Sequence, residues 1–423
     1  MPIHRLSLCV VMLAMAMGWT ASVARAVPVV TPVSSPIRNE VRGLWVLRST
    51  LTSPQRIAEL VRTAAAGGYD TLLVQVRGRG DAYYHSEVDP RAAELGDQPA
   101  SFDPLATTLE AAHAAGLKVH AWINVNLVAS ATSLPRSRDH IVPRHPGWLM
   151  VPRAIAADLY GLDPRTPEYV GRLARWTRDR GDTVEGLYLS PVSDGAQDYT
   201  LSVIAELTRS YPLDGVHLDY IRYPSAEFDY SRMTVDAFRR EQLPKMTGAE
   251  RDRLDRLGRT DPLVWTRTYP DGWARFRRDR LTELVRRIRD VVKRERPTAV
   301  ISSAVVPDPA QARDGKLQDW AAWAEAGLLD VVCPMAYAQD RSDFAAQIEA
   351  ATQGAHGRPI WAGIGAWRLP VGRVAEHLMS ARKSGAAGVL LFSYDSLLTV
   401  SAPRGAFFAQ LRPSLVGDRS GDR

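Results

Sequence analysis

The segment Asp214–Pro224, DGVHLDYIRYP, concentrates more chemically active side chains than any other stretch of the chain. It holds two carboxylates, a histidine, an arginine and two tyrosines around three apolar residues. The apolar residues predict a short strand, and Pro224 ends it. In barrel enzymes the reactive groups lie at the carboxyl ends of buried strands. We therefore expect Asp219 to be the principal carboxylate of an active site.

The elements that would position Asp219 alternate along the chain between Val41 and Pro413. Eight short segments are apolar on both faces and rich in Val, Ile or Leu, which is typical of parallel strands that are covered on both sides. The expected strands are Gly43–Leu47, Thr71–Val76, Lys118–Val125, Gly215–Ile221, Val300–Val306, Val331–Met335, Ile360–Ile364 and Gly388–Phe392.

Helical patterns separate these strands. The helices that we expect include Pro54–Ala66, Pro104–Ala115, the stretch with its apolar face from Leu281 to Val292, Phe344–Ala355 and Val374–Lys383. Eight strand and helix pairs in about 370 residues predict an α/β fold, a (β/α)8 TIM barrel. A doubly wound open sheet is the alternative, but Leu47–Thr50 carries no Gly-rich phosphate turn.

Two long insertions should wall the same end of the barrel. Ala129–Glu185 follows the third expected strand and Ser225–Gly272 follows the fourth. Both leave from the carboxyl ends of strands, where loops of this length usually take part in binding.

Polar and aromatic residues gather where the expected strands end. Sugar polymers stack on aromatic rings and exchange hydrogen bonds with amides, carboxylates and guanidinium groups. The binding residues that we expect are Arg77, Asp81, Tyr84, Trp122, Asn124, Asn126, His217, Arg222, Tyr223, Tyr337 and Trp367.

Hydrolysis of a glycosidic bond generally needs two carboxyl groups. We expect Asp219 to act as nucleophile or electrostatic stabiliser, kept ionised by Arg222 or Arg77. The second carboxyl should be a protonated acid in a drier setting. Its candidates are Glu185, Asp308, Asp340, Asp395 and Asp81, among which Asp340 and Asp395 join Asp219 in the predicted catalytic set. Asp308 and Asp319 fit helix caps equally well, and Trp320 and Trp323 fit packing better than sugar binding.

Other chemistries find little support in the sequence. The chain has no G-x-S-x-G elbow, no H-E-x-x-H motif and no Cys/His cluster. We expect no metal and no cofactor. The formal net charge is +6, but the basic residues are spread out. The densest run, Arg275–Arg296, alternates with acids as a solvated helix face does, so no nucleic-acid partner is expected.

The first 26 residues are typical of a secretory signal peptide, with a basic start, an apolar run over Leu6–Trp19 and an Ala24–Ala26 cleavage site. Its removal would lower the charge from +6 to +4, because Arg5 and Arg25 would go. It would also leave Cys333 as the only thiol. We expect an exported protein of the periplasm or medium without a membrane-spanning segment, a linker over 27–40, a barrel over 41–415 and a flexible tail over 416–423.

Seven segments occur together in an order that resembles a known family. They are GLWVLRST, LLVQVRGRGDAYYHS, HAWINVN, YLSP, DGVHLDYIRYP, DVVCPMAY and GVLLFSYDSL, and they are similar to the bacterial glycosyl-hydrolase-like family 10. The resemblance implies a barrel in the cell envelope or outside the cell. It also implies cleavage of peptidoglycan glycan strands that have lost their stem peptides. The family often carries a second acid where this chain has Tyr220.

The sequence thus favours a glycoside hydrolase that acts on cell-wall glycan. Two alternatives stay open at this point. One is an envelope barrel that binds glycan without cutting it, since no Glu ends the fifth expected strand. The other is a metal-dependent amidase or deacetylase.

Overall fold

The computed structural model describes residues 40–130, 132–401 and 403–417. Every element below belongs to the unit formed by residues 36–423. The predicted signal peptide, residues 27–39 of the predicted linker and residues 418–423 of the predicted tail lie outside the described residues. Two end positions differ from prediction. Glu40 is buried and forms an ion pair with Arg382 at 2.8 Å, and Val416 is the last residue of a helix.

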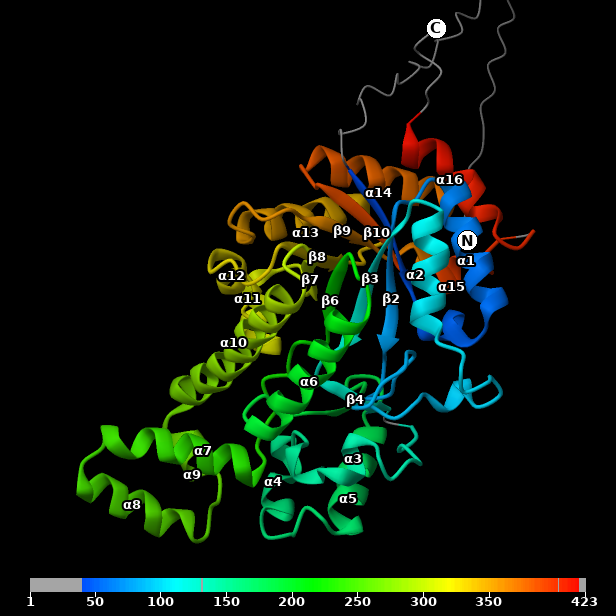
Figure 1. The fold of residues 1–423 in the computed structure, drawn as a ribbon. Coiled ribbons are helices and arrows are strands. Elements are labelled where there is room, and N and C mark those ends of the chain that lie inside the picture. Colours follow the sequence, from blue (N-terminus) through cyan, green and yellow to red (C-terminus); the bar gives the residue numbers. More distant parts are fainter. Residues whose placement is uncertain (1–39, 131, 402, 418–423) are drawn as a thin grey trace, which may run out of the picture. The chain divides into compact units, whose positions relative to one another are not determined.

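Eight parallel strands close into a barrel in the order β1-β10-β9-β8-β7-β6-β3-β2. This confirms the predicted (β/α)8 architecture, and each expected strand is present. The barrel strands are β1 (Val41–Val46), β2 (Thr71–Arg77), β3 (Lys118–Asn124), β6 (Gly215–Asp219), β7 (Val300–Val305), β8 (Val331–Ala336), β9 (Trp361–Ile364) and β10 (Gly388–Leu391). Figure 1 shows the strands with the helices packed around them.

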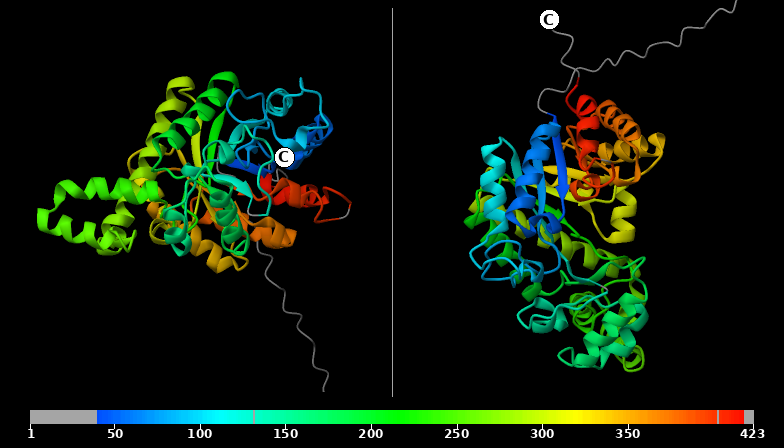
Figure 2. Two further views of the ribbon diagram at one scale, coloured as in Figure 1. Left: turned by 90° about the horizontal axis from the view of Figure 1, so that it is seen from below. Right: turned by 90° about the vertical axis from the view of Figure 1, so that its right-hand side faces the viewer.

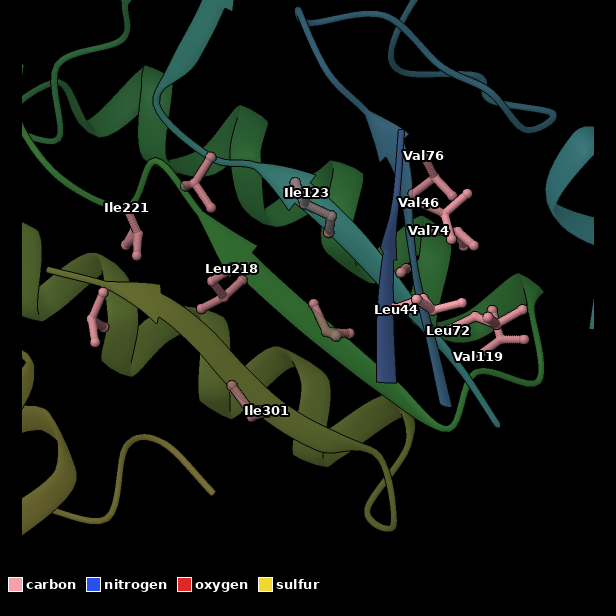
Figure 3. Packing of buried hydrophobic residues seen from close by; sticks show 14 of the residues in the cluster. Leu44, Val46, Leu72, Val74, Val76, Val119, Ile123, Leu218, Ile221 and Ile301 are labelled. Carbon is pink, nitrogen blue, oxygen red and sulfur yellow. The ribbon is translucent and has the colours of Figure 1, made fainter. Parts of the chain in front are cut away.

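Side chains alternate along each strand between the barrel interior and the helices outside, as the two-residue period of a strand requires. Figure 3 shows Leu44, Val46, Leu72, Val74 and others of the outer set, which pack with the helices into one large core. The inner set includes Trp45, Leu73 and Trp122, which form a separate cluster. The barrel is therefore a filled core, which includes the buried polar side chains of His120, His217 and Ser302 among the apolar ones.

The helices follow the strands as the apolar periodicity predicts. The Ser53 hydroxyl caps α1 by accepting from the Arg56 NH, and the apolar face of α10 from Leu281 to Val292 is buried. The helices that follow barrel strands are α1 (Pro54–Gly67), α2 (Pro104–Ala114), α6 (Asp194–Ser210), α10 (Pro270–Glu295), α11 (Pro309–Lys316), α12 (Trp320–Glu325), α13 (Arg341–Gly354), α14 (Val371–Lys383), α15 (Tyr394–Leu397) and α16 (Ala406–Val416). Trp320 and Trp323 of α12 are fully buried.

The two insertions lie beyond the carboxyl ends of the strands, below the arrowhead of β2 in Figure 1, and the segment around α8 projects sideways in the left view of Figure 2. Side chains of both insertions pack into a common core that includes Val128, Leu187, Phe238 and Trp273. In the structure the first insertion extends slightly beyond the expected Ala129–Glu185, because β4 (Leu127–Ser130) begins it and β5 (Gly186–Tyr188) ends it. Between these strands lie α3 (Ile141–Arg144), α4 (Arg153–Tyr160) and α5 (Pro167–Arg178), and the second insertion holds α7 (Arg232–Gln242), α8 (Gly248–Gly258) and α9 (Val264–Thr268).

In the part of the chain that the structure describes, no helix combines the length and the apolar character needed to cross a bilayer.

Candidate active site

Asp219 is the last residue of β6, at the carboxyl-terminal end of the barrel. Its neighbour across the β3–β6 ladder is Asn124, and one step deeper Trp122 pairs with His217. Because residues paired across a ladder lie side by side on the same face of the sheet, Asp219 and Asn124 are neighbours at the strand ends, and Trp122 and His217 are neighbours one step deeper. The sequence places these residues at strand ends, and the fold brings them together.

The carboxylate of Asp219 is buried and accepts hydrogen bonds from two described donors. The Tyr220 backbone NH donates to Oδ1 at 2.7 Å, and the Trp122 indole donates to Oδ2 at 3.2 Å while it also donates to Asn124 Oδ1 at 3.0 Å. Burial raises the pKa of Asp219 to about 6, although the Tyr220 NH, the charge of Arg222 and the Trp122 indole act in the opposite direction. A carboxyl with this pKa is able to hold a proton near neutral pH and release it.

The backbone after Asp219 turns through an unfavourable conformation. Tyr220 has φ of 49°, in the left-handed region that residues with a Cβ rarely enter. The side-chain amide of Asn126 donates to the Arg222 carbonyl at 3.2 Å, and its backbone NH donates to the Tyr220 carbonyl at 3.3 Å. These bonds help to hold the turn that presents the Tyr220 NH to Asp219. Asn126 therefore supports the turn after β6, in addition to the binding role that the sequence predicts for it.

Glu185 reaches the same site from the first insertion. Its Oε1 forms an ion pair with Arg222 at 2.7 Å, and its Oε2 accepts from the Tyr188 hydroxyl at 2.7 Å. Burial acts to raise the pKa of Glu185, but the charge of Arg222 and the hydrogen bonds from Tyr188 and Arg222 hold it below its usual value. The charge of Glu185 in turn contributes to the raised pKa of Asp219. The site thus holds one carboxyl that favours its proton and one that favours its charge.

This distribution reverses the prediction for the two carboxyls. The sequence argument makes Asp219 the ionised group and its partner the protonated acid. Of the two arginines expected near Asp219, only Arg222 influences its pKa strongly. Arg77 is fully buried and forms an ion pair with Asp89 at 2.6 Å. It also donates to the Asn124 carbonyl at 2.7 Å, so it supports the β2 and β3 ends and is committed to structural partners.

His217 is placed differently from its predicted role as a binding residue. Its Nε2 accepts from the Trp45 indole at 3.0 Å, and its Nδ1 lies 2.9 Å from the Ser302 hydroxyl. Burial lowers the pKa of His217 to about 3. It is a neutral, fully buried residue whose two nitrogens are both engaged within the barrel, so it supports the barrel one step deeper than Asp219.

Asp340 and Asp395, which the sequence predicts in the catalytic set with Asp219, both have structural hydrogen-bond partners of their own. The exposed Asp340 carboxylate accepts from the Ser342 hydroxyl at 2.6 Å and caps α13 by accepting from the Ser342 and Asp343 NH groups. These bonds, that of the hydroxyl first, lower its pKa. Asp395 accepts from the Leu47 NH at 2.7 Å and from the hydroxyls of Ser49 and Thr50 at 3.0 and 2.5 Å. Asp395 therefore anchors the loop after β1.

Two tyrosines that the sequence assigns to binding are core residues. Tyr84 is buried with its ring edge against Tyr211 at 5.9 Å. Tyr223 has no exposed surface and its hydroxyl donates to the Arg277 carbonyl at 3.3 Å. Both lie beside strand ends, where a pattern of residue types does not distinguish packing from binding.

Aromatic rings surround the top of the barrel beside Asp219. Tyr337 and Trp367 are half-buried and meet edge to face at 5.0 Å. The ring centroid of Phe392 lies 5.3 Å from that of Trp367 and 6.3 Å from that of Trp122. The charge of Asp219 contributes to a raised pKa of Tyr337, after the larger effect of burial. Phe392 belongs to this group although the sequence argument uses it only as a strand residue.

Two further residues escape the sequence argument. Tyr188, from the YLSP segment, donates to Glu185. Arg79 lies in the same loop as Asp81, whose carboxylate accepts from the Arg79 backbone NH at 2.9 Å. The aromatic and basic residues of those two segments are the only signals that point to them. Within residues 40–130, 132–401 and 403–417, no three His, Cys, Asp or Glu side chains gather as a metal site would require.

The fold and the site define the class of protein: a TIM barrel with a buried carboxyl at the end of its fourth barrel strand and aromatic rings beside it. The model of the family Glycosyl hydrolase-like 10 matches residues 40–360. The chain therefore belongs to this family, as its sequence segments suggest.

Named relatives and solved structures agree with that class. The chain is 26% identical to glycosyl hydrolase DigH of Escherichia coli strain K12 over 298 residues, which are 64% of this chain and 55% of the relative. It is 23% identical to glycosyl hydrolase YngK of Bacillus subtilis over 331 residues, 70% of this chain and 54% of the relative. The chain thus spans about half the length of these relatives.

The glycoside hydrolase domain of PgaB (BpsB) from Bordetella bronchiseptica superposes with a TM-score of 0.61 at 15% identity, covering 89% of this chain and 99% of that domain. The β-galactosidase Gan42B of G. stearothermophilus gives a TM-score of 0.58 at 15% identity, over 90% and 57% of the two chains. At this identity the likeness concerns the fold alone.

Proposed function

We propose that this protein hydrolyses glycosidic bonds of bacterial cell-wall glycan, and that peptidoglycan strands without stem peptides are its substrate. The observation that carries the proposal is the buried Asp219 carboxyl, whose pKa is raised to about 6 by burial at the carboxyl-terminal end of a barrel in this family. The family resemblance supports the substrate class, since its members include enzymes that cut peptide-free strands.

Asp219 serves as the general acid in this proposal. The group that protonates a leaving glycosidic oxygen must keep its proton near the working pH, and a dry setting raises a carboxyl pKa for that purpose. Asp219 has such a setting, because Trp122 lies against it and Tyr337 is close enough for its pKa to respond to the Asp219 charge. The Trp122 indole and Tyr220 NH then stabilise the anion that remains after proton transfer.

Glu185 serves as the ionised partner. An oxocarbenium-like transition state carries positive charge, which a nearby carboxylate stabilises. Arg222 and Tyr188 keep Glu185 charged and fix its orientation through the two 2.7 Å contacts. This chain has Tyr220 where the family often carries a second acid. In this proposal Glu185 supplies the second carboxyl instead, from the insertion that precedes α6 (Asp194–Ser210).

The aromatic residues supply the contact surface for sugar. Rings with one exposed face stack on the C–H faces of pyranoses. Tyr337 and Trp367 are half-buried and lie together with Phe392 at the carboxyl ends of β8, β9 and β10. Their position beside Asp219 supports a glycan as the substrate class.

The test is direct. The purified protein is incubated with peptide-free glycan strands, and new reducing ends and shortened products are measured. We expect products from the wild type and from the control Asp340→Asn, and a loss of product with Asp219→Asn. Binding of the strands without any product from the wild type would favour the glycan-binding barrel. Released acetate or peptide with a chelator-sensitive rate would favour the amidase or deacetylase.

Export to the periplasm or medium is part of the same proposal, since cell-wall glycan lies outside the cytoplasm. It is motivated by the Leu6–Trp19 apolar run and the Ala24–Ala26 site. Cell fractionation and sequencing of the mature amino terminus test it. A protein recovered in the cytoplasm with residues 1–26 intact would contradict it.

A further inference from the structure

The guanidinium of Arg79 is held beside the proposed active site without a described acceptor for most of its donors. Its Nε and Nη1 atoms are buried and have no hydrogen-bond partner among residues 40–130, 132–401 and 403–417. Buried charged donors are normally paired, because leaving them unpaired costs free energy. A guanidinium in this state donates to an incoming acceptor without first breaking a bond to the protein.

Arg77, two residues earlier at the end of β2, is anchored by a carboxylate, although its Nη2 is also buried without a described partner. Its Nε forms a 2.6 Å ion pair with Asp89, and neither side chain has exposed surface. Arg77 is thus committed to the fold. Arg79 has the same guanidinium group, but its Nε and Nη1 have no carboxylate partner within the part of the chain that the structure describes.

The loop that carries Arg79 is fixed by bonds on both sides. The Arg79 NH donates to Asp81 Oδ1 at 2.9 Å, and the Arg79 carbonyl lies 2.7 Å from His140 Nε2. The Asn124 amide donates to the Gly78 carbonyl at 2.8 Å. A binding group on a fixed backbone loses little entropy when its ligand arrives.

The electrostatic surroundings of Arg79 favour an anion. Burial lowers the pKa of Arg79, and the neighbouring charge of Arg48 lowers it further. Arg48 lies against the same loop, since a Cβ added to Gly78 would be 2.8 Å from its Nη1. The charge of Asp81 acts to raise the pKa of Arg79. The Asp81 carboxylate accepts from the backbone NH of Arg79 and not from its guanidinium. Two guanidinium groups held together gain most from a ligand with negative charge.

Arg79 also lies near residues that contact the two proposed catalytic carboxyls, since the adjacent Gly78 carbonyl accepts from Asn124, which pairs with Asp219 across the β3–β6 ladder. Burial raises the pKa of Tyr220 to about 12, and the charge of Arg79 acts against this rise. The charges of Tyr188 and Tyr220 in turn act to raise the pKa of Arg79. Tyr220 donates to Asp219 through its NH, and Tyr188 donates to Glu185 through its hydroxyl. A ligand held by Arg79 would thus be a neighbour of the bond that is cut.

We propose that Arg79, with Arg48 beside it, binds a carboxylate of the glycan: the free lactyl carboxylate of a muramic acid residue that has lost its stem peptide. This inference rests on the proposed function and adds the group that selects the substrate. A guanidinium pairs with a carboxylate through two parallel hydrogen bonds. In a strand with stem peptides that carboxyl is part of a neutral amide, which offers neither the charge nor the second equivalent oxygen.

The experiment compares two forms of one substrate. Peptide-free strands are used as they are, or after their carboxylates have been converted to methylamides. Cleavage rate and Kd are measured for both forms. We expect the wild type to prefer the carboxylate form about tenfold or more, the scale of a hydrogen bond to a charged group. Arg79→Gln should bring this ratio close to one, while Arg79→Lys should keep part of it.

The control is Arg153→Gln, which removes an exposed arginine of the first insertion that forms a 3.7 Å contact with Glu227. It should leave the preference unchanged. Arg48→Gln provides a second test that does not depend on the folding of the Arg79 variants, and it should reduce the ratio by a smaller factor.

Each outcome decides between the two proposals. If the wild type acts on both substrate forms equally, or if Arg79→Gln lowers both equally, the carboxylate subsite is wrong and the proposed hydrolysis still stands. If the wild type neither cleaves nor binds either form, both proposals fail. A preference that is present in Kd alone, and lost in Arg79→Gln, supports the subsite in a barrel that binds without cutting.

Discussion

The carboxylates at the end of β6 and those after β8 and β10 occupy similar positions in the fold but have different surroundings. Asp219 is buried, and the described donors to its oxygens are one backbone NH and one indole. Asp340 is exposed and accepts two backbone NH groups at the start of α13. Asp395 accepts one backbone NH and two hydroxyls from the loop after β1.

The difference separates an acid that is available for chemistry from acids that are committed to structure. A carboxylate with enough donors has its charge stabilised, and it fixes the groups that donate to it. Where the effect of burial on the pKa is larger than the opposing effect of the hydrogen-bond donors, the carboxyl keeps its proton to higher pH. That is the condition of Asp219, whose pKa is raised, and the opposite of Asp340, whose pKa is lowered.

Asp219→Asn should reduce the rate of glycan cleavage at least ~100-fold, the scale of a general acid–base contribution. The amide keeps the shape of the side chain and still accepts from the Tyr220 NH, so the fold should persist. Initial rates of reducing-end formation measure the effect, and circular dichroism checks the fold. A folded variant with near-normal turnover would remove Asp219 from the chemistry.

Glu185→Gln should reduce cleavage by about 10- to 100-fold, because the substitution removes the charge that Arg222 and Tyr188 maintain. The matched control is Glu168→Gln, which removes an exposed carboxylate from an i,i+4 ion pair with Arg172 on α5. Surface pairs of this kind contribute little, so the control should retain wild-type rates. Equal rates for the two variants would show that Glu185 only orients Arg222.

Cleavage should fall as the pH rises through about 6. Burial raises the pKa of Asp219 to about 6 in the free protein, so its acid form is lost above that pH. The pKa of Glu185 is lowered, so its charge persists to more acidic pH and the rate should be highest between the two values. A kcat/KM profile measures this, and a rate that increases from pH 6 to 8 would contradict the assignment of Asp219 as the acid.

The same titration affects folding with a definite sign. Because the folded pKa of Asp219 lies above its unfolded value, its contribution to stability is present at low pH and is lost as the pH rises through about 6. Asp219→Asn has no such loss. Its Tm should therefore exceed that of the wild type at pH 8, and the difference should shrink toward pH 4.

Asp395→Ala should lower the free energy of unfolding by about 2 kcal/mol, because the Leu47 NH and the hydroxyls of Ser49 and Thr50 lose their common acceptor. The loop after β1 carries Arg48, so cleavage should change by a few-fold at most. Urea unfolding and initial rates separate the two effects. A loss of turnover as large as that of Asp219→Asn would restore Asp395 to the catalytic set.

Asp340→Ala should have the smallest effect. Its carboxylate caps α13 from an exposed position, so its loss should lower Tm by less than Asp395→Ala does. Asp340→Asn should be close to neutral, since Asn is an equally good cap. Cleavage should be unchanged in both. Thermal unfolding together with the reducing-end assay provides the comparison.

The barrel and its principal acid could be predicted from local patterns. Apolar segments of four to eight residues between helical patterns predict buried parallel strands, and all eight occur in the closed barrel. The DGVHLDYIRYP segment places Asp219 at a strand end because the strand stops where the apolar residues stop. Trp122 and Asn124 follow from the same argument applied to β3.

The rest of the site depends on contacts between distant segments. Glu185 stands among five candidate acids in the sequence, and only its pairing with Arg222, 37 residues later, distinguishes it. Arg77 at the end of β2 and Arg79 in the loop after it lie two residues apart, yet among the described residues only Arg77 forms an ion pair, with Asp89. No local pattern contains that difference.

The sequence by itself determined the eight strands, the position of Asp219 at the end of the fourth barrel strand and the family to which the chain belongs. Tertiary structure decided which carboxyl accompanies Asp219, which of the two keeps its proton and which expected site residues are core. Strand formation follows from side chains that are close in the chain. Protonation and pairing follow from burial and from the distances between charges, and these exist only after the insertion and the barrel strands have been brought together.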